Sequence, residues 1–288
     1  MTRPDKENDR TKHIEITNAN IGPVFLTFKA KEDYKKLIFS LKNVKPFIMF
    51  QAEDQSIHKI WKVFNEKDKN NIKNYFHNIS KLYIADGHHR AASASRVQKL
   101  KEEKNPKHNG SEPYNYFLSV IFPHDEMQIL DYNRVIRDLN GLSSIQLIEL
   151  IKTNFNIFPL KKAIKPNTKH HFSMFIDNQW YQLIAKNKII SKDPIDQLDA
   201  SILQNFLLEP FLNISNPRQD KKIDFVGGTR GLTELEKRCN IDCKIAFALY
   251  PVSINDLLLI ADSGKIMPPK STWFEPKLRS GLIVRLFD

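Results

Sequence analysis

The sequence predicts a mixed-sheet protein of the α/β or α+β class. Segments typical of strands and of helices alternate along all 288 residues, which favours sheets covered by helices. Hairpin signals at 46–64 and 170–185 argue against a purely parallel sheet. Because 41% of the residues are apolar, a chain of this length can bury a substantial core.

The first half of the chain contains an expected strand, turn and helix unit. Residues 82–86 are typical of a short strand that ends in Asp-Gly, and 90–103 favour a helix. Before it, the first twenty residues are densely charged. The other expected elements are a buried strand within 21–28 after a Gly-Pro turn, a helix at 32–44, paired strands at 46–64, a helix at 67–80, a loop at 104–115 and a strand at 116–123.

The second half begins with an amphipathic helix at 142–155, which a serine can cap. The Lys- and Pro-rich stretch 159–168 is the best internal boundary. We therefore expect a motif-bearing domain at 1–160 and a C-terminal α/β part at 161–288, packed against it. Beyond the boundary the expected elements are a hairpin at 170–185 that turns at Asp177-Asn178, a helix at 193–212 stopped by Pro210, a strand at 222–226, a glycine turn at 227–231, a helix at 232–239, a strand at 244–252, a helix at 254–264 and a strand at 280–287.

The amino-acid composition limits the classes of partner that the protein is expected to bind. The formal charge of +11 comes from lysines scattered through nearly every segment and not from a stripe on one face, so nucleic-acid binding is not expected. No stretch approaches the ~18 apolar residues of a membrane span, and the polar start is unlike a secretory signal. We expect a soluble cytoplasmic protein in which Cys239 and Cys243 are reduced packing residues and not metal ligands.

The segment Asp86-Gly87-His88-His89-Arg90 is the strongest candidate for a reaction site. Glycine permits a positive φ and close approach of a ligand, and the first turn of a helix offers unpaired N–H groups and a partial positive charge. Arg90 could bind a phosphate through two hydrogen bonds, and the histidines could donate to phosphate oxygens or transfer a proton. Asp86 could coordinate Mg²⁺ or act as a base.

A purely structural role is the alternative for the same five residues. Asp86 would then cap the helix, Gly87 would close the turn, and the three residues that follow would be solvated. Caps rarely carry a His-His-Arg sequence behind them, so we favour the functional interpretation. It is weakest for His89, because neighbouring side chains on a helix diverge.

Several separated motifs together resemble one bacterial family. They are TRPDKENDR, NANIGPVFLTF, YIADGHHRAASA, DPIDQLD, DFVGGTRG and MPPKSTWFEPKLRSGLIVRL. By these motifs the chain is identified as a member of the family known as domain of unknown function 1015, and the resemblance covers essentially the whole chain.

The Asp-Gly-His-His-Arg element is also similar to the phosphate-binding motif of the ParB and sulfiredoxin superfamily, which includes nucleotide-dependent free-serine kinases. This resemblance implies a kinase that uses ATP or ADP with Mg²⁺ and transfers phosphate to the hydroxyl of free serine or a similar amino acid. It implies that Asp86 is the metal ligand or base. The residues that it assigns to the phosphates and the metal are Asp86, Gly87, His88, His89 and Arg90.

Members of the family normally carry a long segment before Thr-Arg-Pro, with a Lys-x-His-Glu stretch whose glutamate is a candidate base. The resemblance therefore implies that the N-terminal third of the family is missing from this chain. Two alternatives to a kinase stay open. One is a nucleotide-binding regulator of ParB-like ancestry that does not turn nucleotide over, and the other is an inactive, truncated family member.

The charges near the start match the family pattern Thr-Arg-Pro-x-Lys-Glu-x-Asp-Arg, and some are expected to face the same pocket. A solvated, frayed terminus is the equal alternative. The residues concerned are Arg3 and Lys6, as phosphate-binding candidates, and Glu7, Asp9 and Arg10.

Three other places are secondary candidates. Residues 227–231 could form an anion nest beneath Arg230, or a tight turn that needs two glycines. Lys270 lies in a segment that could close on a nucleotide as a mobile loop, although it lacks the glycines of a P-loop. His124 could approach the site from a loop.

Overall fold

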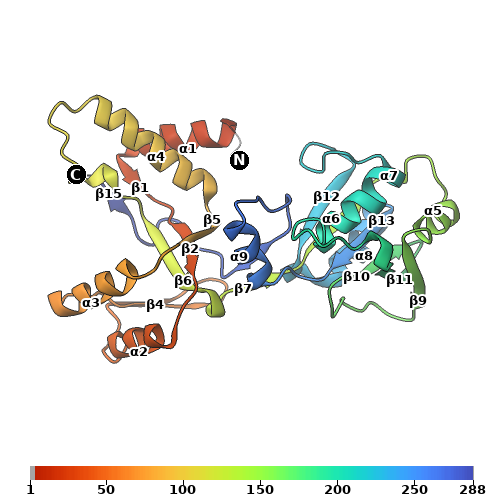
Figure 1. The fold of residues 1–288 in the computed structure, drawn as a ribbon, viewed down its shortest axis with the longest axis horizontal. Helices are drawn as coiled ribbons and strands as arrows, with labels where there is room; N and C mark the ends of the chain where they lie inside the picture. Colours follow the sequence, from red (N-terminus) through yellow and green to blue (C-terminus); the bar gives the residue numbers. More distant parts are fainter. Residues whose placement is uncertain (1–3, 288) are drawn as a thin grey trace. The chain divides into compact units, whose positions relative to one another are not determined.

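A computed structural model describes residues 4–287 and divides the chain into two compact units (Figure 1). Unit 1 consists of Met1–Glu126 with Leu278–Asp288, and unit 2 of Met127–Lys277. The boundary expected at 160/161 falls inside unit 2, because strands on both of its sides pair in one sheet. The predicted class, α/β or α+β with mixed sheets, is confirmed.

Unit 1 is built on a three-stranded sheet of order β5-β2-β6, in which β2 is antiparallel to β5 and parallel to β6. Two antiparallel pairs, β1 with β15 and β3 with β4, complete its strands. The strands are β1 (Ala19–Asn20), β2 (Val24–Phe28), β3 (Ile48–Gln51), β4 (Ile57–Ile60), β5 (Tyr83–Asp86), β6 (Ser119–Pro123) and β15 (Arg285–Leu286). The helices are α1 (Pro4–Thr17), α2 (Glu32–Leu41), α3 (Glu66–His77) and α4 (His88–Glu103), with short 3-10 turns η1 (Pro113–Asn115) and η2 (His124–Glu126).

The densely charged start of the chain, for which the sequence predicts no element, forms helix α1 and packs along α4 (Figure 1). The fully buried hydroxyl of Ser93 in α4 donates to the carbonyl oxygen of Glu7 at 3.1 Å. Ile14 of α1 and Val97 of α4 form an apolar cluster with Phe287. The described charges of this segment therefore lie on a packed helix and not on a frayed end.

Unit 2 is built on a six-stranded antiparallel sheet of order β12-β8-β13-β10-β11-β9, with a separate pair of β7 and β14. The strands are β7 (Gln128–Leu130), β8 (Tyr132–Ile136), β9 (Phe155–Leu160), β10 (His171–Ile176), β11 (Gln179–Ala185), β12 (Ile223–Gly227), β13 (Ile245–Leu249) and β14 (Trp273–Glu275). The helical elements are α5 (Ser144–Ile151), η3 (Asn187–Ile189), α6 (Asp199–Leu203), the π-helical η4 (Gln204–Leu208), α7 (Glu209–Leu212), η5 (Gly228–Arg230), α8 (Gly231–Ile241) and α9 (Ile254–Asp262).

Both faces of the six-stranded sheet are covered. Successive side chains of a strand point to opposite faces, so Phe172 and Met174 of β10 join one core and Phe175 joins the other. The larger core includes residues of α5, α6, η4 and α7, and the smaller one includes Leu235 of α8. Unit 2 thus has a continuous interior on each side of its sheet.

Two predicted elements differ from the structure. Pro210 does not stop its helix, because it lies in the first turn of α7, where proline is tolerated, and the chain leaves the helix at Asn213 in a left-handed conformation. The strand predicted at 280–287 is reduced to β15. No helix in the described part of the chain is long and apolar enough to cross a membrane.

Candidate functional site

The predicted strand, turn and helix around Asp86 is present in unit 1. Strand β5 ends at Asp86, and α4 begins at His88. Gly87, between them, has φ 88° and ψ 26°, a left-handed conformation that favours glycine. Gly87 is the N-cap residue of α4 and has no side chain with which to cap the helix. The Asp86 carboxylate accepts from the Gly87 N–H at 2.8 Å.

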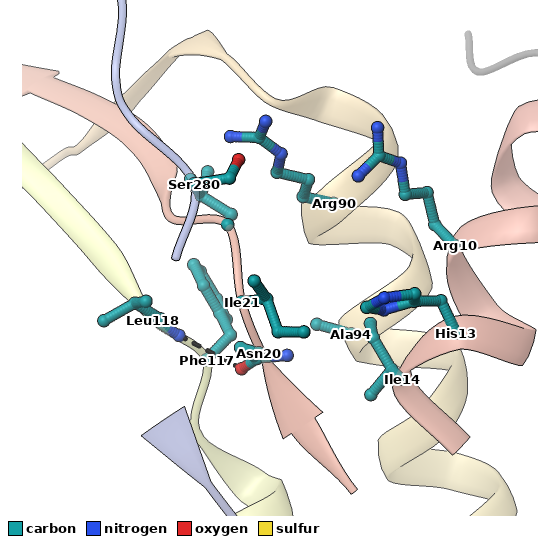
Figure 2. A pocket seen from close by; sticks show the side chains of 12 residues that line it. Arg10, His13, Ile14, Asn20, Ile21, Arg90, Ala94, Phe117, Leu118 and Ser280 are labelled. Carbon is teal, nitrogen blue, oxygen red and sulfur yellow. Dashed lines mark hydrogen bonds between the residues drawn. The ribbon is translucent and has the colours of Figure 1, made fainter. Parts of the chain in front are cut away.

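A pocket of about 230 Å³, pocket 1, runs along the first turns of α4 (Figure 2). Arg90 and Ala94 of α4 line it, and Arg90 donates to the carbonyl oxygen of Pro23 at 2.7 Å. Gly22 makes room for this arginine, since a Cβ there would lie 3.0 Å from the Arg90 guanidinium carbon. The other lining residues come from four further segments and are Arg10, His13, Ile14, Asn20, Ile21, Gly22, Val24, Phe117, Leu118 and Ser280.

Helix α1 supplies a second guanidinium to pocket 1. Arg10 and His13 lie one turn apart on α1 and both face α4 in Figure 2. Burial lowers the pKa of Arg90 below its ordinary value, the nearby charge of Arg10 lowers it further, and the charge of Asp86 opposes both. None of the described residues that line pocket 1 is an aspartate or glutamate. The pocket is therefore suited to a negatively charged group.

His88 and His89 have different surroundings. The His88 side chain is exposed to solvent. Desolvation by the surrounding protein nevertheless lowers its pKa, and the negative charge of Asp86 opposes this decrease only in part. The neutral imidazole is therefore the dominant form of His88 at pH 7. His89 is half-buried, and its Nδ1 atom is shielded from solvent without a hydrogen bond in the described structure. Neither histidine lines pocket 1.

The candidate residues near the N-terminus fall into two groups, those that line pocket 1 and those that do not. Arg10 reaches pocket 1, whereas Lys6, Glu7 and Asp9 do not line it, and Arg3 lies outside the described residues. The sequence did not single out His13, Asn20 or Ser280, which do line the pocket. The spacing of Arg10 and His13 was an available signal, because residues three apart share one face of a helix.

His124 is also separate from pocket 1. Its Nδ1 accepts a hydrogen bond from the Ala30 N–H at 3.2 Å, next to the end of β2. The histidine therefore joins η2 to the chain that follows β2, which is a structural role.

The glycine turn with Arg230 belongs to unit 2 and is shaped by packing. A Cβ at Gly227 would lie 2.4 Å from the Trp273 ring, and one at Gly228 would lie 2.4 Å from Asp131. The Gly228 N–H donates to the Asp131 carbonyl oxygen at 2.8 Å. Arg230 is exposed and pairs with Glu234 at 3.8 Å. These contacts favour the tight turn over the anion nest.

The two cysteines are packing residues. Cys243 is buried in the smaller core of unit 2, and Cys239 packs against it. Burial raises the pKa of Cys239 to about 12 and that of Cys243 to about 11. Both thiols therefore stay protonated at neutral pH.

Comparison with known proteins identifies the family. Residues 1–201 match the family described as "Protein of unknown function (DUF1015)". The chain belongs to this family. The match includes the Asp86 to Arg90 motif of the DUF1015 chain and every pocket 1 residue except Ser280. Comparison with curated proteins gave no match.

Solved structures provide distant similarities. A conserved hypothetical protein from Pyrococcus furiosus is 12% identical, with 97% of this chain and 87% of that chain covered and a TM-score of 0.43. A free serine kinase in complex with AMP is 12% identical, with 95% and 81% covered and a TM-score of 0.45. SbnI with a C-terminal truncation from Staphylococcus aureus is 10% identical, with 99% and 82% covered and a TM-score of 0.49.

Proposed function

We propose that unit 1 binds the phosphates of ATP or ADP in pocket 1 and transfers a phosphoryl group to the hydroxyl of free serine or a similar amino acid. The observation that carries this proposal is the pair of arginines, Arg10 and Arg90, which face one pocket from two different helices. The motif similarity to the ParB and sulfiredoxin superfamily supports the phosphate assignment. Phosphoryl transfer requires mainly positioning and charge stabilisation, which guanidinium groups carried by two packed helices would supply.

In the proposed reaction the bond between the transferred phosphorus and the nucleotide oxygen breaks as the serine oxygen bonds to phosphorus. The serine hydroxyl loses its proton, and Asp86 is the proposed acceptor. We assign His88, neutral at pH 7, as a hydrogen-bond donor to a phosphate oxygen that lies beyond the lining of pocket 1. Arg90 holds phosphate with the donors that Pro23 does not use.

Alternatively, Asp86 would be the protein ligand of Mg²⁺ and not the proton acceptor. In nucleotide sites Mg²⁺ is commonly held by one or two carboxylates together with substrate phosphates, and it neutralises the charge that develops there. Asp86 is solvent-exposed, and its charge acts on both Arg90 and His88. A single carboxylate beside the phosphate pocket is therefore a sufficient protein contribution.

A nucleotide-binding regulator is the second candidate. It is favoured by the absence of a carboxylate from the lining of pocket 1, because binding requires only the cations there. Both proposed functions require nucleotide binding in pocket 1, but only the kinase converts the nucleotide to product.

Mass spectrometry for O-phosphoserine tests the proposal directly. Purified protein is incubated with Mg²⁺, L-serine and either ATP or ADP, in parallel with Asp86→Ala and a control, Arg96→Gln. Arg96 lies on α4 outside the lining of pocket 1, and its guanidinium donates to the Asn8 side chain of α1 at 2.6 Å. We expect product from the wild-type protein and the control, and a loss of roughly 10²- to 10³-fold in Asp86→Ala. Nucleotide binding without product would favour the regulator, and neither binding nor product would contradict both.

A further inference from the structure

Arg134 is a buried cation without an acidic partner among the described residues. It lies on β8, which pairs with β12 and β13, and its side chain is 4% exposed. Its Nη1 donates to the carbonyl oxygen of Tyr132, and its guanidinium lies 5.4 Å from the centre of the Phe225 ring. Neither contact supplies a negative charge.

A buried charge of this kind destabilises the fold unless a counter-charge compensates for it. Burial lowers the pKa of Arg134 to about 10, so the guanidinium still carries its proton at neutral pH. One carbonyl oxygen satisfies only one of its five N–H donors. The position is therefore energetically costly in the protein alone.

Arg134 faces a cavity of about 270 Å³, pocket 2, within unit 2. The polar residues that line it include Ser201 of α6 and Gln204 and Asn205 of the π-helical η4. Single π-helical turns are rare and occur frequently at functional sites. The remaining lining residues are Ile195, Asp196, Ala200, Leu208, Pro217, Ile266, Pro268 and Pro269.

A second cation lies next to the proline pair that lines pocket 2. Lys270 has φ 55°, an uncommon conformation for a residue other than glycine. Its Nζ donates to the Tyr132 hydroxyl at 3.1 Å and lies 5.9 Å from the centre of the Phe225 ring, the ring that Arg134 also contacts. In the described structure no acidic side chain pairs with Lys270. Two cations without acidic partners in the described structure thus contact one aromatic ring. Arg134 lines pocket 2, and Lys270 directly follows the lining residue Pro269 without lining the pocket itself.

We propose that pocket 2 binds a small metabolite through a carboxylate or phosphoryl oxyanion, with Arg134 as its principal partner and Lys270 as a second positive charge. The oxyanion provides the counter-charge that the fold lacks at Arg134, and the polar side chains of α6 and η4 contact the rest of the metabolite. Among the described residues that line pocket 2, Asp196 is the only acidic one, and it suits a ligand that also carries an amino group. This site is independent of the proposed phosphoryl transfer in unit 1.

Thermal unfolding with two probes, inorganic phosphate and malonate, tests this site. Because the proposed function predicts phosphate binding in pocket 1 as well, every protein in this experiment carries both Arg10→Gln and Arg90→Gln, which removes the two arginines of that pocket. We expect at least one probe to raise the Tm of this host in a concentration-dependent manner. A response to phosphate alone identifies a phosphoryl ligand, and a response to malonate alone identifies a carboxylate.

Three variants in the same host locate the response. Arg134→Met should abolish the probe-dependent shift and raise the Tm without probe, because it removes an uncompensated buried charge. Lys270→Ala, at the surface, should weaken probe binding about two- to fivefold. The control Arg137→Gln removes an exposed arginine that already pairs with Asp242 at 2.6 Å and should keep the full shift. No response to either probe, or a response that persists in Arg134→Met, would overturn the proposal.

Discussion

Pocket 1 and pocket 2 each contain an arginine, but the two side chains are held differently. Arg90 of pocket 1 is half-buried, bonds to a backbone carbonyl and has Arg10 near it at the surface. Arg134 of pocket 2 is almost completely buried, and no acidic side chain of the described chain pairs with it. A solvated cation costs little without a ligand, whereas a buried one lowers stability until a counter-charge is bound.

The two arginines therefore predict that a change of charge has different consequences in the two units. In unit 1 a change of charge should alter ligand affinity more than folding. In unit 2, where charged groups lie against a core that covers both sheet faces, a change of charge should first alter the free energy of unfolding.

Asp199 offers the largest expected effect and tests the unit 2 side of this comparison. It is 6% exposed, its Oδ1 accepts from the His170 N–H at 2.8 Å, and burial raises its pKa to about 7. Lys169 opposes the rise and Asp256 adds to it. In the folded protein Asp199 therefore holds a proton between pH 3.8 and about 7 that the unfolded chain releases. Stability should fall as pH rises through this window, by up to about 4 kcal/mol.

Denaturant unfolding at pH 5 and pH 8 measures this effect. Asp199→Asn mimics the protonated side chain, so the variant should lose most of the pH dependence that the wild-type protein shows in this range. An equal pH dependence in both proteins would show that Asp199 is ionised in the folded state and that burial in unit 2 does not control its charge.

Arg90→Gln has the next largest expected effect and tests the unit 1 side. It removes a charged donor from pocket 1 while Arg10 remains. Because hydrogen bonds to charged groups contribute about 1.5–3 kcal/mol, ADP affinity should fall roughly 10- to 150-fold in calorimetric titrations. Arg96→Gln, on the same helix and outside pocket 1, should bind ADP normally. If Arg90→Gln lowered the free energy of unfolding but left the ADP affinity unchanged, the charge of Arg90 would act on folding and not on ligand binding. That result would contradict the difference proposed between the two units.

Gly87→Ala has the smallest expected effect. It distinguishes the stability cost of backbone strain from an effect on ADP binding. A left-handed conformation costs an alanine roughly 1–2 kcal/mol. Gly141→Ala, at φ 78° in open space in unit 2, is the matched control and should lose a similar amount of stability. Only Gly87→Ala should also weaken ADP binding, because only Gly87 adjoins pocket 1. Equal ADP affinity in the two variants would show that the turn at Gly87 does not contribute to nucleotide binding.

The sequence predicted most elements because their apolar periods are regular. It predicted the position of the Asp86 to Arg90 motif between a strand and a helix for the same reason. It predicts no strand at 128–136, where buried Asn133 and Arg134 interrupt the apolar pattern of β8. Pocket 1 required the structure, because Arg10, Asn20 and Ser280 are brought together only by long-range packing.

Hydrogen–deuterium exchange with and without saturating ADP tests the central claim, that nucleotide phosphates bind in pocket 1. Amides of the first turns of α4 and of α1 near Arg10 should become protected in the wild-type protein, and this protection should disappear in Arg90→Gln. Saturating ADP that leaves residues 86–94 unchanged, or that protects only segments of unit 2, would contradict the proposed function.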